Sequence, residues 1–384
     1  MSDLNHAALQ ESILIHFGNI TDPRVKARSR HNLLNIIVIA LFAVLCGADG
    51  WIGVETYGKA KQDWLSTFLD LSQGIPSHDT FGRVFSILNP EELEQSFQGW
   101  VRLIAQKLGL NVIAIDGKSM KGSYDRESSL EALQMVSAWS SVHGLVLGQC
   151  AVERKSNEIR AIPILLEQLD VKGAIITIDA MGTQKSIAQM IQKSEADYIL
   201  ALKANHPTLN NVAKEWFREN REALASMTEI ISSSSTEGGH HRIEKRQFWQ
   251  IPVERVFSHD SIKEWSGLQT LVIEESHRTL WNRDTCTNRF FLSSLPADYT
   301  EFSNNIRSHW SIENQLHWCL DVIFREDDSR LREGHAPRNM SVLRRMSLNL
   351  LRREPSRTSL KMKRYKAGLD NNYLLKILAN SALF

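Results

Sequence analysis

The chain has 384 residues, of which 42% are hydrophobic and 23% are charged, with 45 Lys and Arg against 44 Asp and Glu. This length allows two or more domains, and the composition is that of a folded globular protein, which excludes the disordered and fibrous classes. The net charge of +1 gives no sign of a nucleic-acid partner. The distribution of charge along the chain therefore matters more than its sum.

The cysteines and the apolar segments indicate a cytoplasmic protein without a membrane partner. Cys46, Cys150, Cys286 and Cys319 lie far apart without CxxC spacing, so neither a zinc knuckle nor a disulfide framework is predicted. The longest apolar run, residues 33–48, is shorter than the roughly 20 residues that span a bilayer. The first residues also lack the basic and apolar regions of a secretion signal.

Residues 1–105 are predicted to form an N-terminal helical domain. Apolar periodicity predicts helices over 33–46, 58–69 and 90–108. The segment PSHDTFGRVF places a polar cap before an apolar-periodic run, which predicts a further helix start. Two interpretations of that helix stay open: it binds DNA ends, or it packs the helical domain onto the next one.

From residue 111 onward, short apolar runs alternate with Gly and polar turns, which predicts alternating strands and helices. NVIAIDG, LQMVSAWS and HGLVLGQCAV are predicted strands, followed by a helix over 158–169, the strand GAIITIDA, a helix over 183–193 and the strand ADYILALK. This order predicts an α/β domain over 106–350 with a mixed five-stranded sheet and flanking helices.

The α/β alternation stops after residue 203, and a β-rich insertion is predicted over about 203–287. A helix over 207–224 leads to a Ser-rich run at 232–235 and a Gly pair, which predict a surface loop. HRIEKRQFWQI and LQTLVIEES predict an inserted antiparallel sheet. NRFFLSS then resumes a buried strand, and a long helix is predicted over 299–324.

The C-terminal end is helical and basic, and residues 351–384 are predicted to form a basic tail. Residues 338–366 contain ten Lys or Arg against the single acid Glu354. Basic side chains interspersed with Leu, Met and Tyr are compatible with a segment that lies along DNA phosphates.

Two aspartates end apolar strands. Asp116 follows NVIAI, and Asp179 follows GAIITI. The carboxyl ends of strands in open α/β sheets are where ligands and metals collect. An ionised Asp beside an apolar run costs desolvation energy unless a cation or several donors compensate. Two such groups at neighbouring strand ends would repel each other, and a shared divalent metal is the simplest remedy.

A third carboxylate, Glu313, lies in RSHWSIENQLHWCLDVIF, whose apolar residues keep helical spacing. A helix over the sheet would direct Glu313 toward Asp116 and Asp179. Oxygen ligands of this kind suit Mg²⁺ or Mn²⁺. Two such ions, roughly 3.5–4 Å apart, activate a water or a 3′-hydroxyl and stabilise the leaving oxygen in phosphoryl transfer. The alternative is ordinary structure, since an Asp after a strand often forms a turn or cap.

AIDGK, TIDAMGTQ and HWSIENQLHW, in that order, resemble the DDE transposases of bacterial insertion sequences, specifically the H-repeat-associated type, over nearly the whole chain. The resemblance implies a ribonuclease-H-like core with Asp116 and Asp179 on adjacent strands, Glu313 on a late helix and a β-rich insertion between them. It departs in one respect. Relatives often carry a Tyr, Arg, Glu, Lys signature, which would fall here on Ile306, His309, Glu313 and Leu320. Only the Glu matches.

Several further side chains are candidate DNA contacts. Two lysines follow the first Asp, another ends the last predicted core strand, an arginine follows the His pair in GGHHRIEKR, and three residues surround Glu313. These candidates are Lys118, Lys121, Lys203, Arg242, Arg307, His309 and His317. Lysines after strands are common, and Lys203 with Asn205 equally fits a simple turn. Adjacent His240 and His241 would point to opposite faces of a strand, so a shared metal is not expected.

The sequence therefore predicts a transposase that uses two Mg²⁺ or Mn²⁺ ions to cut and join double-stranded DNA. Its expected partners are the transposon ends and target DNA, bound by a homodimer. Three alternatives stay open: a nuclease that only hydrolyses DNA, an inactive relative that binds DNA, and a hydrolase of a small phosphoester. The last would leave the insertion and the basic C-terminal segment without a purpose.

Overall fold

The computed structural model describes residues 6–25, 27, 29–109, 111–124, 131–152, 158–227, 230–239, 242–281 and 283–379. The chain divides into two compact units. The first contains residues 1–109, 117–157 and 313–384. The second contains residues 110–116 and 158–312. Both units are therefore built from segments that are distant in the sequence.

The N-terminal part of the first unit is helical, as predicted. Its helices are α1 (His6–Phe17), α2 (Leu33–Leu45), α3 (Trp51–Ala60), α4 (Gln62–Leu65), α5 (His78–Ile87) and α6 (Pro90–Leu108). Polar caps begin three of them: Asn32 accepts from the amide of Leu34, Ser77 from that of Thr80, and Asn89 from that of Glu91. The predicted helix over 58–69 is wrong in its bounds, because α3 ends at Ala60 and α4 covers only Gln62–Leu65, with Lys61 as the cap between them.

Helix α2 forms the centre of the first unit. All of its residues except Leu34 are buried, and the ring of Phe42 lies 6.2 Å from those of Trp64 and Phe68. The single polar residue of the run, Asn35, donates to the carbonyl of Asp70 at 2.6 Å. In the part of the chain that the structure describes, no helix is both long and apolar enough to cross a membrane.

A β-hairpin and the C-terminal helices complete the first unit. Strands β2 (Leu133–Ser140) and β3 (Leu145–Val152) pair antiparallel. The 3-10 turn η2 (Lys121–Ser123) precedes the hairpin, and the last helices are α12 (Trp318–Val322), α13 (Ala336–Arg353), α14 (Leu360–Leu369) and α15 (Asn371–Ala379). Asn349 of α13 links to β3, since its side chain accepts from the amide of Val146 at 2.9 Å and donates to its carbonyl at 2.8 Å.

Several cations of the basic C-terminal segment are packed into the first unit, whereas Arg357, Lys361 and Lys366 are exposed, and a DNA contact by these three stays a prediction. Arg344 and Arg345 of α13 are 1% and 0% exposed. Arg338 binds Glu94 at 2.8 Å, and Arg364 donates to the carbonyl of Val44 at 2.9 Å. These cations are buried or bound within the first unit, so the interpretation of 338–366 as a phosphate-contacting segment is wrong for them.

The second unit is built on a mixed sheet with the order β1-β4-β5-β9-β8-β7-β6. Strands β1 (Val112–Met120), β4 (Ile175–Ile178) and β5 (Asp197–Leu202) are parallel, and β9 (Arg283–Ser293) pairs antiparallel with β5. The five predicted core strands, β1 to β5, are all present. Their parallel and antiparallel pairing with flanking helices is the predicted ribonuclease-H-like α/β class.

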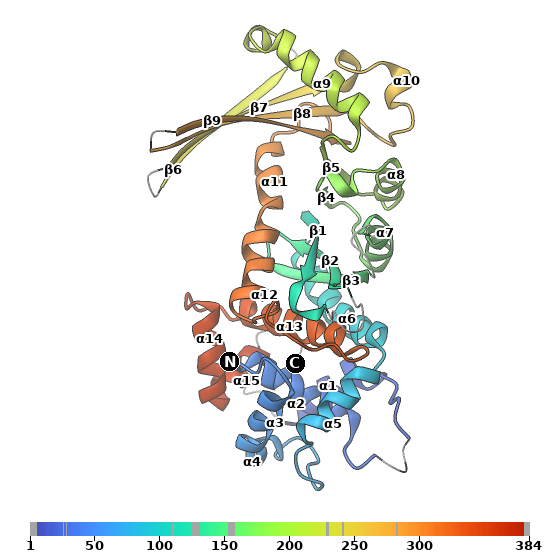
Figure 1. The fold of residues 1–384 in the computed structure, drawn as a ribbon, viewed down its shortest axis with the longest axis vertical. Helices are drawn as coiled ribbons and strands as arrows, with labels where there is room; N and C mark the ends of the chain where they lie inside the picture. Colours follow the sequence, from blue (N-terminus) through green and yellow to red (C-terminus); the bar gives the residue numbers. More distant parts are fainter. Residues whose placement is uncertain are drawn as a thin grey trace. The chain divides into compact units, whose positions relative to one another are not determined.

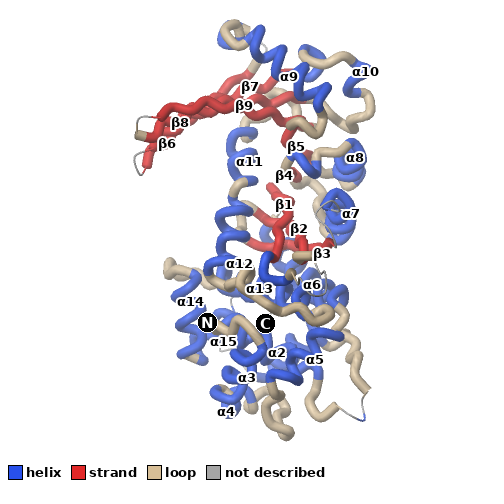
Figure 2. The backbone as a smooth tube through the Cα atoms, in the orientation of Figure 1, coloured by secondary structure: helices blue, strands red, loops and turns tan. Residues whose placement is uncertain are grey.

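The insertion extends the core sheet. Strands β6 (Ile231–Gly239), β7 (Arg242–Pro252) and β8 (Thr270–Leu280) are joined to β5 through β9, and Figure 2 shows the four strands running side by side. The surface loop predicted at 232–235 is wrong. Those serines pair with β7 from Ser232↔Trp249 onward, because a neighbouring strand supplies ladder partners that override weak β propensity.

Helices cover the sheet of the second unit. Figure 1 shows α7 (Glu158–Gln168) and α8 (Lys185–Lys193) on one side of β4 and β5, and α11 (Phe302–His309) on the other. Helix α9 (Pro207–Asn220) packs on the inserted strands, with the ring of Phe217 5.3 Å from that of Trp249. The segment predicted as one long helix over 299–324 is helical over most of its length but interrupted: α11 ends at His309, and a π-helical turn, η7 (Ile312–His317), precedes α12.

Candidate active site

Asp116 and Asp179 lie at equivalent positions on adjacent parallel strands. The β1–β4 register pairs Ile115 with Ile178, so Asp116, within β1, and Asp179, directly after β4, each follow a residue of the last paired position. Neighbouring strands are about 4.8 Å apart, and side chains in register point to the same face. Both aspartates are half-buried. The second unit therefore brings two carboxylates together at the carboxyl edge of its parallel strands.

A tight turn fixes the backbone after Asp179. Its carboxylate accepts a hydrogen bond of 3.0 Å from the amide of Met181 and caps the 3-10 turn η4 (Ala180–Gly182). Gly182 is required there, because a Cβ would lie 2.4 Å from Ile178 and 2.6 Å from Ile162. Asp179 thus caps a turn at the end of a strand that neighbours the strand of Asp116, and this turn role is compatible with a catalytic role.

The loop after β5 supports that turn. Asn205 donates to the carbonyl of Ala180 at 2.5 Å, and His206 makes a 2.6 Å hydrogen bond with the carbonyl of Thr183. The hydroxyl of Thr183 donates to the carbonyl of Ala201 at 2.7 Å. Sequence reasoning treated Asn205 as a DNA contact or a turn residue, and the structure uses its side chain to hold the Asp179 turn.

His309 lies beside Asp179 in the second unit. Its Nδ1 is 2.9 Å from the hydroxyl of Thr177 on β4. Burial lowers the pKa of the imidazole to about 4; Asp179 raises it, and Lys203 lowers it. The ring is therefore neutral at pH 7. It can exchange hydrogen bonds at the strand end but carries no positive charge there.

Glu313 is exposed and lies in the π-helical turn η7 of the chain. It is the first residue of the last segment of the first unit, whereas Asp116 and Asp179 belong to the second. π-Helical turns are rare and occur mostly at functional sites, because the extra residue redirects the side chains around it. The apolar periodicity of the segment predicted a helix but gave no sign of this turn.

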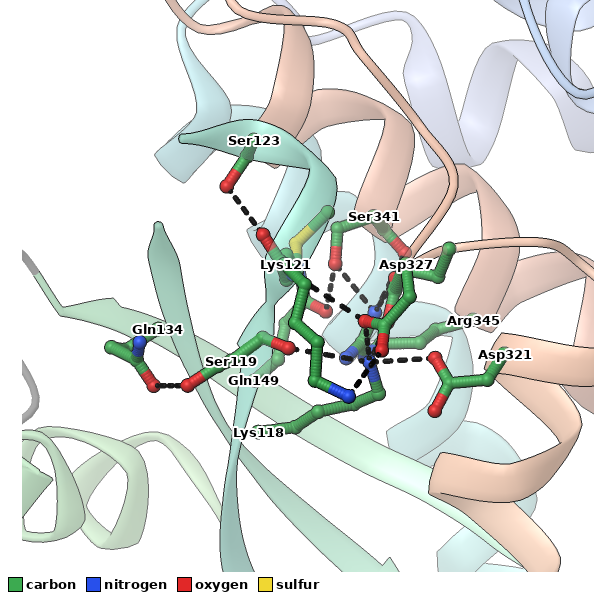
Figure 3. Close-up of polar contacts among 12 residues, drawn as sticks. Lys118, Ser119, Lys121, Ser123, Gln134, Gln149, Asp321, Asp327, Ser341 and Arg345 are labelled. Atoms are coloured by element: carbon green, nitrogen blue, oxygen red, sulfur yellow. Dashed lines mark hydrogen bonds and ion pairs between the residues drawn. The ribbon is translucent and has the colours of Figure 1, made fainter. Parts of the chain in front are cut away.

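Lys118, two residues after Asp116 in β1, is enclosed by acids of the first unit (Figure 3). Its ammonium lies 2.7 Å from Asp321, 2.8 Å from Asp327 and 3.7 Å from Glu326. Burial lowers the pKa of Lys118, but these carboxylates more than offset that effect and raise it. The ammonium is therefore charged and already bound by carboxylates, and a DNA contact by Lys118 stays a prediction.

A fully buried ion pair lies behind Lys118. Glu326, which is 0% exposed, accepts from Arg345 at 2.9 Å, and Arg345 also donates to the hydroxyl of Ser341 at 2.5 Å. Gly122 packs against the same region, since a Cβ there would lie 2.6 Å from the carbonyl oxygen of Asp327. Sequence reasoning missed these acids, although the run REDDSR shortly after Glu313 displays them.

The other candidate DNA contacts differ in their surroundings. Lys121 and Lys203 are exposed, and Lys121 lies 3.1 Å from Asp327. Arg307 forms an ion pair with Glu237, and His317 lies in η7. Arg242 begins β7, but its side chain lies outside the described part of the structure, as do His240 and His241 entirely. Their DNA contacts stay predictions.

Among the described residues, one cluster of three side chains has the composition of a metal site. Glu275, His277 and Cys286 lie on β8 and β9 of the insertion. Arg221 binds both oxygens of Glu275 at 2.7 Å, so a guanidinium already neutralises that carboxylate. This cluster lies on strands other than those that end at Asp116 and Asp179.

Comparison with known proteins identifies the family of this chain. The family model described as "Transposase DDE domain" matches residues 107–350, and "DDE_Tnp_1-associated" matches residues 14–101. The chain therefore belongs to the DDE transposase family. The H repeat-associated putative transposase YhhI of Escherichia coli K12 is 37% identical over 97% of this chain and 99% of its own length, so the chain is of the H-repeat-associated type.

Two further similarities complete the comparison. The putative transposase YncI of Escherichia coli O157:H7 is 39% identical over 96% of this chain and 95% of its own length. A solved structure of the piggyBac transposase synaptic complex with hairpin DNA matches 99% of this chain and 81% of that chain, with a TM-score of 0.39 and 10% identity. The second similarity is too low to carry an argument about function.

Proposed function

We propose that this chain cleaves DNA and joins the cut ends to target DNA by metal-dependent phosphoryl transfer. The observation that carries the proposal is the β1–β4 register, which sets Asp116 and Asp179 side by side at the carboxyl edge of the parallel strands. Membership of the DDE transposase family supports the same chemistry. Glu313, in its π-helical turn, is proposed as the third carboxylate of the set.

The donor set fits a hard divalent cation. Two half-buried carboxylates on adjacent strands repel each other unless a cation lies between them, and oxygen donors are those that Mg²⁺ and Mn²⁺ prefer. Bound there, two such ions supply activation of the attacking hydroxyl and stabilisation of the leaving oxygen. The η4 turn and Asn205 hold the Asp179 backbone, and neutral His309 offers a hydrogen bond beside it.

The partners of this reaction are the element's ends and a target duplex. We propose that residues 106–350 carry the chemistry, that residues 1–105 bind the ends, and that a homodimer in the cytoplasm brings two ends together. Sedimentation of the full chain, with and without DNA that contains an element end, checks the dimer. A particle with one chain per DNA end pair would contradict it.

A strand-transfer assay separates the proposal from a nuclease that only hydrolyses. The full chain is incubated with a labelled DNA end and a supercoiled target plasmid in Mg²⁺. The proposal predicts covalent joints between end and plasmid, which EDTA abolishes. Cleaved ends without joints would favour the nuclease, and DNA binding without either product would favour the inactive relative. Inverted repeats with short target duplications around the coding region would support transposition independently.

A further inference from the structure

A basic hollow lies on the helical part of the first unit, between residues 24–25 and 29–31 on one side and helix α5 on the other. Its volume is about 640 Å³, within the roughly 300–1,000 Å³ typical of ligand pockets. Four of the ten residues that line it are basic (Arg24, Arg30, His31 and Arg83), and no acid is among those ten. The chain's near-zero net charge therefore conceals a local concentration of positive charge.

Two of these cations are available to a ligand. Within the described part of the chain, Arg30 and Arg83 are exposed and take part in no ion pair. The Nε of Arg83 donates a hydrogen bond of 3.3 Å to the carbonyl of Asp79. Arg24, in contrast, is bound to Asp22 at 2.7 Å. Burial, followed by the charges of Arg24 and Arg30, lowers the pKa of His31, which agrees with a positive potential in the hollow.

The positive charge that would attract an anion to the hollow comes from side chains and not from the amino end of α5. The first amides of that helix are already bound, since Ser77 accepts from Thr80 and Glu55 accepts from His78 at 2.8 Å. Of the six other residues that line the hollow, three carry hydroxyl groups and three are apolar, and two of the apolar ones are open to solvent, with Val25 65% and Ile87 50% exposed. Cations beside exposed apolar groups match the alternation of phosphate and sugar in a nucleic-acid strand.

We propose that this hollow binds the sugar–phosphate backbone of DNA, with Arg30 and Arg83 on phosphates and Val25 and Ile87 against deoxyribose. This rests on the proposed function, because it names the surface that holds the DNA substrate. Arginine suits the task because its planar guanidinium donates two parallel hydrogen bonds to a phosphate. The hollow lies within residues 14–101, the segment that the transposase-associated family model matches.

Fluorescence anisotropy of the full chain with a short labelled duplex, in EDTA and over a range of salt, tests the proposal. Arg30→Gln and Arg83→Gln should each weaken binding several-fold and reduce the slope of log K against log salt by about 0.9. Lys59→Gln, which removes one charge from the exposed side of α3, is the matched control and should change neither. Arg83→Lys keeps the charge and should restore the slope.

Unchanged affinity and salt slope in both glutamine variants, with melting curves like the wild type, would overturn the proposal. Binding of inorganic phosphate to the same variants is a second test. If the glutamine variants lose phosphate binding but keep DNA binding, the hollow is a small-anion site, and this result would also overturn the proposal. If the wild type joins DNA but the variants bind DNA normally, only this inference fails. If the hollow binds DNA but the wild type neither cuts nor joins, only the proposed chemistry fails.

Discussion

His309 is a half-buried base beside a carboxylate, and its neutral state links stability to pH. Because the native pKa is about 4 and the ordinary value is 6.5, the unfolded chain binds a proton over this range and the native chain does not. The free energy of unfolding therefore contains the full contribution of the neutral ring above pH 6.5. It loses this contribution as the pH falls toward 4. The full effect is up to about 3 kcal/mol.

We expect His309→Gln to remove this part of the pH dependence, because glutamine keeps a hydrogen bond to Thr177 and has no proton to gain. Urea unfolding of both proteins at several pH values between 4 and 7 measures it. The control is His259→Gln, at the exposed start of helix α10 (His259–Ile262) in the same unit. Equal pH slopes for wild type and His309→Gln would show that His309 does not titrate in this way.

At the scale of a single turn, η4 depends on the absence of a side chain at Gly182. We expect Gly182→Ala to destabilise the second unit by about 1–3 kcal/mol, because the new methyl group overlaps Ile178 and Ile162. Gly99→Ala, on an open face of α6, should stabilise by up to about 1 kcal/mol. Thermal unfolding checks both, and an unaltered midpoint for Gly182→Ala would contradict the close packing.

The buried ion pair of Glu326 and Arg345 should contribute more to the free energy of unfolding than the exposed ion pair of Lys121. Glu326→Gln leaves an uncompensated guanidinium in the interior, which costs about 3–5 kcal/mol. Lys121→Gln breaks only a solvent-exposed ion pair with Asp327 and should be close to neutral. Urea midpoints measure the difference. Similar midpoints for the two variants would mean that water, and not Glu326, solvates Arg345.

The sequence predicted the elements that are determined by a pattern within a few residues. It did not predict the elements that form only by pairing with segments far away in the sequence. Asp116 and Asp179 were found because an apolar run followed by Asp is readable within a few residues. Strand β6 was missed because its serines become a strand only by pairing with β7. The π-helical turn at Glu313 was missed because a five-residue hydrogen-bond repeat has no distinct apolar pattern.

Across the whole molecule, some basic residues are buried within the fold, whereas others are exposed and available to bind DNA. Arg344, Arg345, Lys363 and Arg364 are buried, although the sequence displays them as part of a basic tail. The reason is that composition cannot distinguish a cation that faces solvent from one that binds buried acids or carbonyls. Arg24 and Arg30 of the hollow, in contrast, lie in RVKARSRH (residues 24–31), a short basic run that the sequence displays and that sequence reasoning overlooked.

Cleavage and joining by three charge-removing variants test most directly whether this chain is a metal-dependent transposase. Asp116→Asn, Asp179→Asn and Glu313→Gln keep the side-chain size and remove one ligand charge each. We expect each variant to lose both activities in Mg²⁺ or Mn²⁺, to keep DNA affinity close to wild type, and to melt no lower than the wild type, because the repulsion between metal-free carboxylates is relieved. End-specific cleavage that persists in any variant would remove that residue from the site, and persistence in Asp116→Asn or Asp179→Asn would contradict the proposed mechanism.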